Sequence, residues 1–195
     1  MEDARIAAEG KEYALRAVEL GVDDAFALSR AALFFGSLLR DVGTADAIVD
    51  QAIAVNPNLS DAWRVRGWIS FWLGQHERAL EQFQYAMRLN PLDPRSYAAE
   101  NGLAMANFCL HRFENALSWA TKSMARQKNY APPVRCALAS YAMLGRIADA
   151  QTMYDRLRHA GAELTISQIR MRNPCKLQED VELFIEGHRR AGVPE

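Results

Sequence analysis

A spacing of 34 residues recurs along this chain and constrains its fold more than any other feature. Pro57 closes the phrase AIAVNP, and Pro91 closes AMRLNP 34 positions later. Ala116 and Ala150 lie the same distance apart. Apolar residues follow a helical period nearly everywhere, and β-branched runs with alternating polarity are absent. Because 34 residues accommodate two helices and a turn, the spacing predicts an all-α array of helical hairpins.

Residues 60–93 resemble the tetratricopeptide repeat. With Ser60 as position 1, the residue types that the repeat requires fall in register: Trp63 at 4, Gly67 at 8, Gly74 at 15, Ala79 at 20, Phe83 at 24, Ala86 at 27 and Pro91 at 32. Arg66 and Ser70 depart from the usual apolar choices, which predicts slightly weaker packing of the first helix. The resemblance implies a right-handed solenoid of about four helix-turn-helix repeats with a C-terminal capping helix.

The neighbouring repeats fit the pattern more loosely. We expect repeats at 25–59, 60–93, 94–130 and 131–164. The turn inside 25–59 requires one extra residue. Repeat 94–130 carries three extra residues in LDPRSY, and Asp93 followed by Pro94 suits the start of a helix. We therefore expect a longer first helix in that repeat.

Both ends of the array carry additional helices. Residues 1–24 resemble the second helix of a further repeat whose first helix is absent, which predicts an uncovered apolar flank around Leu15 and Leu20. This flank suggests either a segment of a longer protein or docking on another copy. Residues 165–195 form a C-terminal capping segment, in which LQEDVELFIEGHRRAG is an amphipathic helix. Its inward stripe is Val181, Phe184, Ile185 and His188, and Gly192 can terminate it.

Composition excludes several classes of partner. The 23 basic and 24 acidic residues nearly cancel, so no global field recruits nucleic acid or an anionic membrane. The longest apolar run, at 31–39, is too short to span a bilayer, and the acidic N-terminus lacks the features of a signal peptide. We expect a soluble, cytoplasmic protein with no nucleic-acid or membrane partner.

No catalytic, cofactor or metal site is predicted. The cysteines Cys109, Cys136 and Cys175 lack metal-ligand or disulfide spacing, so we expect buried or half-buried free thiols. The four histidines are scattered, and we expect solvated or capping side chains. The sequence contains no phosphate loop, HExxH motif or nucleophile elbow. We therefore expect that this chain is not an enzyme.

The resemblance implies that the first helix of each repeat lines a concave groove. The residues at groove positions that we expect to bind a partner are Arg64, Trp68, Phe71, Trp72, Asn101, Met105, Phe108 and Arg135. An apolar floor edged by two arginines suits a protein or peptide segment with apolar anchors and a carboxylate. The alternative is that the last helix or an N-terminal segment fills the groove, which would make Trp68 and Trp72 ordinary core residues.

A second resemblance covers residues 25–195. The phrases NPNLSDAWRVRGWISFWLGQHERALEQFQYAMRLNPLDP and GHRRAGVPE are similar to the C-terminal repeat region of certain bacterial proteins. Those proteins begin with a class III adenylate or guanylate cyclase domain or with a winged-helix domain. The resemblance implies a non-catalytic interaction or regulatory module of a signalling protein, or a module that forms a homodimer.

Overall fold

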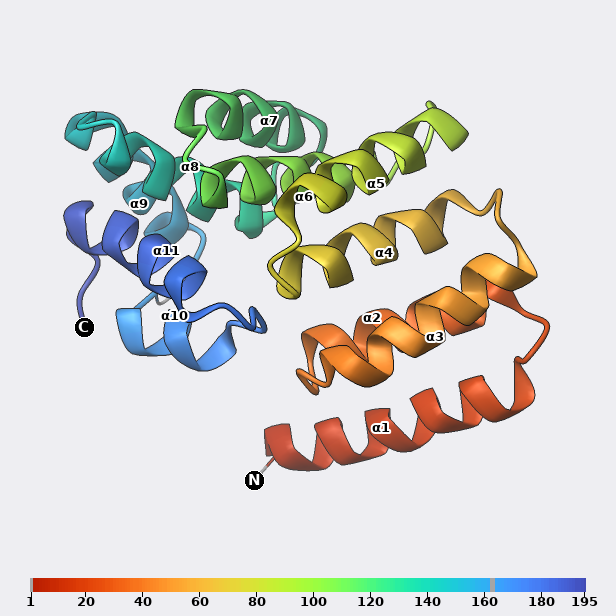
Figure 1. Ribbon diagram of the computed structural model, residues 1–195. Helices are drawn as coiled ribbons and strands as arrows, with labels where there is room; N and C mark the ends of the chain where they lie inside the picture. The colour runs from red at the N-terminus through yellow and green to blue at the C-terminus, as the bar shows by residue number, and fades with distance from the viewer. Residues whose placement is uncertain (1, 162–163) are drawn as a thin grey trace. The chain divides into compact units, whose positions relative to one another are not determined.

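The computed structural model consists of helices joined by short turns (Figure 1). It describes residues 2–161 and 164–195, and the side chains from residue 9 onward. The helices are α1 Glu2–Leu20, α2 Ala25–Ser37, α3 Val42–Val55, α4 Ser60–Trp72, α5 His76–Leu89, α6 Ser96–Cys109, α7 Phe113–Arg126, α8 Ala131–Met143, α9 Ile147–His159, α10 Ile166–Arg172 and α11 Gln178–Arg190. None of the described helices combines the length and the apolar character that a bilayer-spanning segment needs. The boundaries of repeat 131–164 and of segment 1–24 include residues outside the described part of the chain, namely 162–163 and residue 1.

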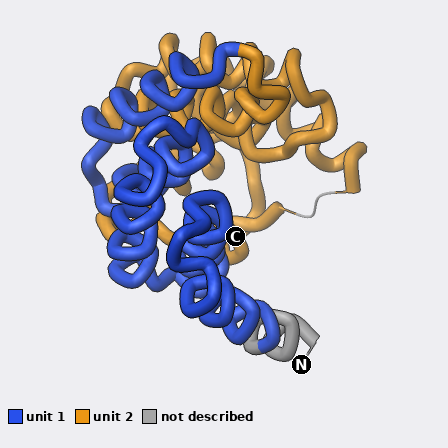
Figure 2. The backbone as a smooth tube through the Cα atoms, turned by 90° about the vertical axis from the view of Figure 1, so that its right-hand side faces the viewer, with its two compact units in different colours: residues 1–91 blue, residues 92–195 orange. Residues whose placement is uncertain are grey.

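The helices form two compact units, residues 1–91 and residues 92–195 (Figure 2). In the first unit, α2 pairs with α3 and α4 pairs with α5, while α1 packs on α2. In the second unit, α6 pairs with α7 and α8 pairs with α9, and α11 packs on α8, α10 and the end of α6. The antiparallel pairs are the expected hairpins, so the apolar stripe of each helix is buried against its partner helix and the adjacent hairpin.

The turns inside the hairpins share one left-handed backbone position. Gly74 and Gly145 adopt φ of 81° and 74°, where a residue without a Cβ atom fits best. At the same point of the other two hairpins stand Arg40, with φ 56°, and His111, with φ 58°. The first hairpin's turn, 38–41, is one residue longer than the turns at 73–75, 110–112 and 144–146, as the sequence predicts.

The core of repeat 60–93 follows from its small residues. A Cβ atom on Gly67 would lie 2.7 Å from the ring of Phe83, so the glycine lets α4 and α5 approach closely.

Arg66 does not weaken this packing, because its buried guanidinium bonds to Asp46 and lies 3.4 Å from Asp50, both on α3. The polar residue at an apolar position therefore ties two helices together through charge-assisted contacts.

The first helix of repeat 94–130 begins later than expected. Its N-cap is Arg95, and Asp93 instead accepts a 2.8 Å hydrogen bond from the Arg95 amide in a tight turn. Helix α6 has 14 residues and α4 has 13, so the first helix is only one residue longer. The other extra residues therefore lie in the turn before α6. Asp and Pro are as favourable in turns as at helix starts, and spacing alone cannot separate the two.

Candidate partner-binding faces

In the first unit, the predicted face of α4 is built around Trp68. Trp68 is half-buried and contacts Phe71 at 5.8 Å and Trp72 at 6.0 Å between ring centroids. It also meets Phe83 of α5 edge-on at 5.3 Å. Its ring is thus held by three aromatic neighbours and keeps part of its surface accessible. Rigid aromatic side chains of this kind are frequent anchors in protein interfaces.

Trp72 and Phe71 belong to the interior. Trp72 is 6% exposed and Phe71 is 2% exposed. Trp72 lies against α2, where a Cβ atom on Gly36 would come within 2.4 Å of its Cζ3 atom. Gly36 therefore makes room for the indole, and Trp72 joins two neighbouring hairpins. Of the aromatic residues predicted for the groove in this unit, Trp68 keeps the largest accessible surface.

Arg64 is engaged by a carboxylate of its own helix. Its guanidinium bonds to Asp61, and both side chains are buried. Asp61 also lies 3.6 Å from Arg30 and 3.5 Å from the Ser29 hydroxyl, both on α2. A partner's carboxylate would have to compete with this internal pair, so Arg64 is poorly suited to the role predicted for it.

In the second unit, α11 lies against the helices that carry the predicted groove positions. Phe184 of α11 meets Phe108 of α6 edge-on at 5.5 Å. A Cβ atom on Gly187 would lie 2.8 Å from the Cβ atom of Ala139 on α8, so the two helices are in close contact. The stripe predicted to face inward is buried, and Gly192 adopts φ 83° after the helix end. Phe108 is therefore a core residue beneath α11.

The remaining predicted residues of this unit differ in accessibility. Asn101 is buried at 2% exposure. Met105 and Arg135 are half-buried. Met105 on α6 and Arg135 on α8 are thus the predicted groove residues of the second unit that keep accessible surface.

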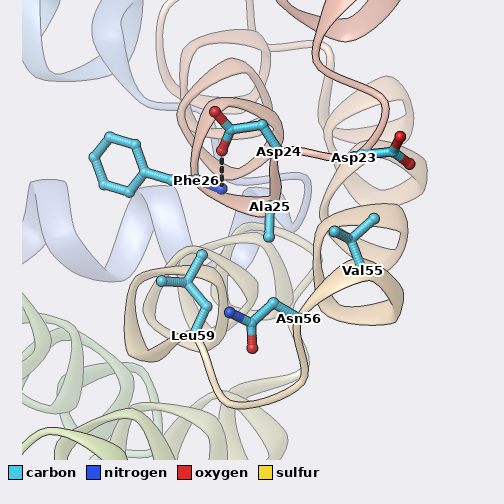
Figure 3. A pocket seen from close by; sticks show the side chains of 7 residues that line it. All are labelled: Asp23, Asp24, Ala25, Phe26, Val55, Asn56 and Leu59. Carbon is cyan, nitrogen blue, oxygen red and sulfur yellow. Dashed lines mark hydrogen bonds between the residues drawn. The ribbon is translucent and has the colours of Figure 1, made fainter.

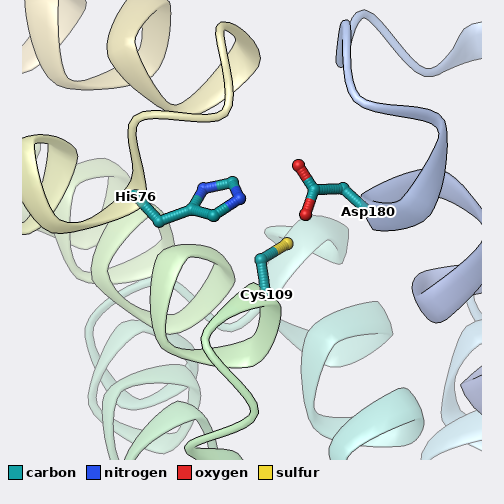
Figure 4. A group of neighbouring side chains, drawn as sticks. All are labelled: His76, Cys109 and Asp180. Atoms are coloured by element: carbon teal, nitrogen blue, oxygen red, sulfur yellow. The ribbon is translucent and has the colours of Figure 1, made fainter.

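A thiol and a carboxylate meet where α6 ends and α11 begins. The Cys109 side chain contacts the carboxylate of Asp180, and both are buried (Figure 4). Burial raises the pKa of the Cys109 thiol, and the negative charge of Asp180 raises it further. The thiol is therefore protonated at neutral pH and is a poor nucleophile. Cys136 is also buried and Cys175 is half-buried, so all three are free thiols of the expected kind.

Two of the four histidines are buried and not solvated: His76 departs from the prediction, whereas the burial of His188 agrees with the inward stripe predicted for the last helix. His188 is 0% exposed, and burial lowers its pKa to about 4. His76, at the start of α5, is 9% exposed and lies 5.4 Å from the ring of Phe71. The helical stripe of α11 had already placed His188 on the inward face, and the interior retains it as a neutral ring. His111 and His159 are exposed.

A pocket of about 550 Å³ lies at one end of the first unit (Figure 3). Its lining residues are Asp23, Asp24, Ala25, Phe26, Val55, Asn56 and Leu59. The Asp24 carboxylate caps α2 by accepting hydrogen bonds from the amides of Phe26 at 2.9 Å and Ala27 at 3.0 Å. The carboxylate of Asp24 therefore has a structural role at the start of α2.

Comparison with known proteins assigns the class of fold. Residues 60–93 match the sequence profile of the tetratricopeptide repeat. The hairpins pack as they do in solved tetratricopeptide solenoids, which confirms the predicted all-α repeat fold. No curated protein sequence matches the chain.

Three solved structures illustrate the likeness. PilW, a type IV pilus biogenesis factor, superposes with a TM-score of 0.71 at 16% identity, covering 97% of this chain and 87% of PilW. For pilF of Pseudomonas aeruginosa the TM-score is 0.64 at 14% identity, with 98% and 90% covered. YrrB, described as a TPR protein with an unusual peptide-binding site, gives 0.56 at 14% identity, with 92% of each chain covered. At these identities the likeness concerns the fold.

Sequence reasoning missed two glycines that allow helices to pack closely beside these faces. Gly36 and Gly187 stand inside helices, where glycine is unfavourable, and each marks a close approach by another helix. The two glycines therefore carried a readable signal in the sequence.

Proposed function

We propose that this chain is a non-catalytic module that binds a protein or peptide segment along the first helices of its repeats. The observation that carries the proposal is Trp68, a half-buried tryptophan at a position that lines the inner face in tetratricopeptide arrays. Met105 occupies the same position of the next repeat and is also half-buried. An aromatic and a flexible apolar side chain suit the apolar anchors of a bound segment.

The test is selection of binding peptides from a displayed random library, followed by affinity measurement on variants. Trp68→Ala should weaken a selected peptide by at least about tenfold, as expected for loss of a central aromatic anchor. Trp119→Ala is the matched control, because Trp119 is also half-buried but lies on α7, the second helix of its hairpin. Equal losses in both variants, or no loss in Trp68→Ala, would count against the proposal.

The finer assignment is a cytoplasmic regulatory module of a bacterial signalling protein. It is supported by the resemblance of residues 25–195 to the repeat region that follows cyclase or winged-helix domains. Its test is genomic and biochemical. The full reading frame should encode such a domain, and that domain's cyclase activity or DNA binding should respond to the selected peptide through this module. A reading frame without either domain would refute the assignment.

A second candidate is self-association through α1. Tyr13 is 70% exposed, Leu20 is 79% exposed and Leu15 is 43% exposed, so α1 presents apolar side chains to solvent. Burying such side chains between two copies is favourable. Sedimentation should then show a dimer that Leu20→Glu converts to a monomer. A monomer at every concentration would exclude this candidate.

A further inference from the structure

Arg135 is a half-buried arginine without an internal counter-charge. Its Nε atom is buried and has no hydrogen-bond partner, and within the described residues its guanidinium forms no ion pair. Burial lowers the pKa of Arg135, and the nearby positive charge of Arg172 lowers it further. A guanidinium that is partly removed from water without a compensating anion carries a desolvation cost, so this arrangement favours an added acceptor.

Other arginines withdrawn from solvent in this chain are paired. Arg66 bonds to Asp46, and Arg64 bonds to Asp61. Arg135 thus departs from the pattern that the rest of the chain follows. The charge that shifts the pKa of Arg135 belongs to a second arginine, Arg172, so positive charge is in excess here.

Three helices bring the relevant groups together within the second unit. Arg135 lies one turn before Ala139 on α8, and Ala139 contacts Gly187 of α11. His188 follows Gly187 directly, and Arg135 lies close enough to contribute to lowering its pKa, after burial. Arg172 ends α10, which packs against α11.

His188 has one ring nitrogen to offer. Its Nδ1 donates a 2.8 Å hydrogen bond to the carbonyl oxygen of Phe184, while its Nε2 is buried and has no partner. The ring is 0% exposed, and none of the charges that shift its pKa is a carboxylate. An unpaired Nε2 becomes a donor when the ring is protonated, which an adjacent anion favours.

We propose that Arg135, Arg172 and His188 form a binding site for an oxyanion, namely a phosphate or carboxylate group. The planar guanidiniums supply paired N–H donors that match the oxygens of either group. Arg172 is exposed and Arg135 is half-buried, so an anion has access from solvent. The site lies within the second unit, whereas Trp68 belongs to the first, and neither proposal depends on the other.

The test is calorimetric titration of the whole chain with inorganic phosphate and with acetate at constant ionic strength. We expect saturable binding. Phosphate should bind more tightly than acetate, because the two guanidinium charges can balance both charges of a dianion. Arg135→Gln and Arg172→Gln should each weaken binding by about tenfold or more, since each removes charge-assisted hydrogen bonds. Arg170→Gln is the matched control for Arg172→Gln. Arg170 lies on α10 with Arg172, but it is paired with Glu182 at 3.1 Å.

The outcomes separate cleanly. Tighter binding of phosphate assigns a phosphate group, and tighter binding of acetate assigns a carboxylate. Absence of saturation with both anions overturns the proposal, as does binding that is equal in wild type and Arg135→Gln. Trp68→Ala should bind phosphate as the wild type does, whatever its effect on peptide binding.

A stability measurement guards against a variant that merely misfolds. Without added anion, Arg135→Met should unfold at the same temperature as the wild type or higher, because it replaces an uncompensated charge with an apolar side chain of similar length. Phosphate should raise the Tm of the wild type and leave that of Arg135→Met unchanged. A marked fall in the Tm of Arg135→Met would indicate an internal partner for the guanidinium and overturn the proposal.

Discussion

Because Trp72 packs against Gly36, the effect of Gly36→Ala on stability should change sign when Trp72 is replaced by alanine. Trp72 is 6% exposed, and a tryptophan buries about 150–250 Å². At about 25 cal/mol per Å² its burial contributes roughly 4–6 kcal/mol, so Trp72→Ala should cost about 3–5 kcal/mol after partial relaxation. This is a large share of the roughly 5–15 kcal/mol that stabilises a domain.

Gly36→Ala tests the same contact from the other side. In the wild type the added methyl group meets Trp72 at 2.4 Å, and overpacking of this kind costs about 1–3 kcal/mol. In the Trp72→Ala background the obstacle is gone, and alanine is favoured over glycine in a helix by up to about 1 kcal/mol. The same substitution should therefore destabilise the wild type and stabilise the variant.

Urea unfolding followed by far-ultraviolet circular dichroism measures all four proteins, and the double-mutant cycle isolates the contact. Leu92→Ala is the control, since Leu92 is 92% exposed and its loss should change stability by less than about 0.5 kcal/mol. The reasoning fails if Trp72→Ala costs less than about 1 kcal/mol, or if Gly36→Ala has the same effect in both backgrounds.

Three further predictions follow from local features. Arg40→Gly should stabilise the protein by up to about 1 kcal/mol in urea unfolding, because exposed Arg40 holds φ at 56°, and a loss of stability would refute the strain. Gly187→Ala should speed hydrogen exchange in α11, because its methyl group would lie 2.8 Å from Ala139; unchanged exchange would show that the helices yield. Burial lowers the pKa of His188 to about 4, from an ordinary value of 6.5. Stability should thus be unaffected by this ring above pH 6.5 and fall by about 3 kcal/mol as pH decreases to about 4. His188→Leu should lose less over this range, and equal losses would contradict the assignment.

The repeat architecture could be predicted because its determinants are local. Gly67 is needed for the close packing of α4 and α5, and Gly74 is needed for the left-handed turn between them, so both act within one hairpin. The longer turn of the first hairpin was predictable for the same reason. The start of α6 was not, since the Asp93–Pro94 pair suits a turn as well as a helix start.

The candidate faces were harder to predict because they depend on contacts between distant segments. The groove positions of the repeat place Trp68 and Trp72 on one face, but only the opposing Gly36 makes Trp72 interior. Similarly, Phe108 is covered by Phe184, which lies far along the chain. Periodicity identifies the side of a helix, whereas the segment that covers that side is set by tertiary packing.

Backbone hydrogen exchange with and without a selected peptide tests the central claim most directly. If the peptide binds along the first helices, amides of α4 and α6 near Trp68 and Met105 should exchange more slowly in the complex, while those of α5 and α7 change little. Protection confined to α5 and α7, or to the exposed side of α1, would contradict the account.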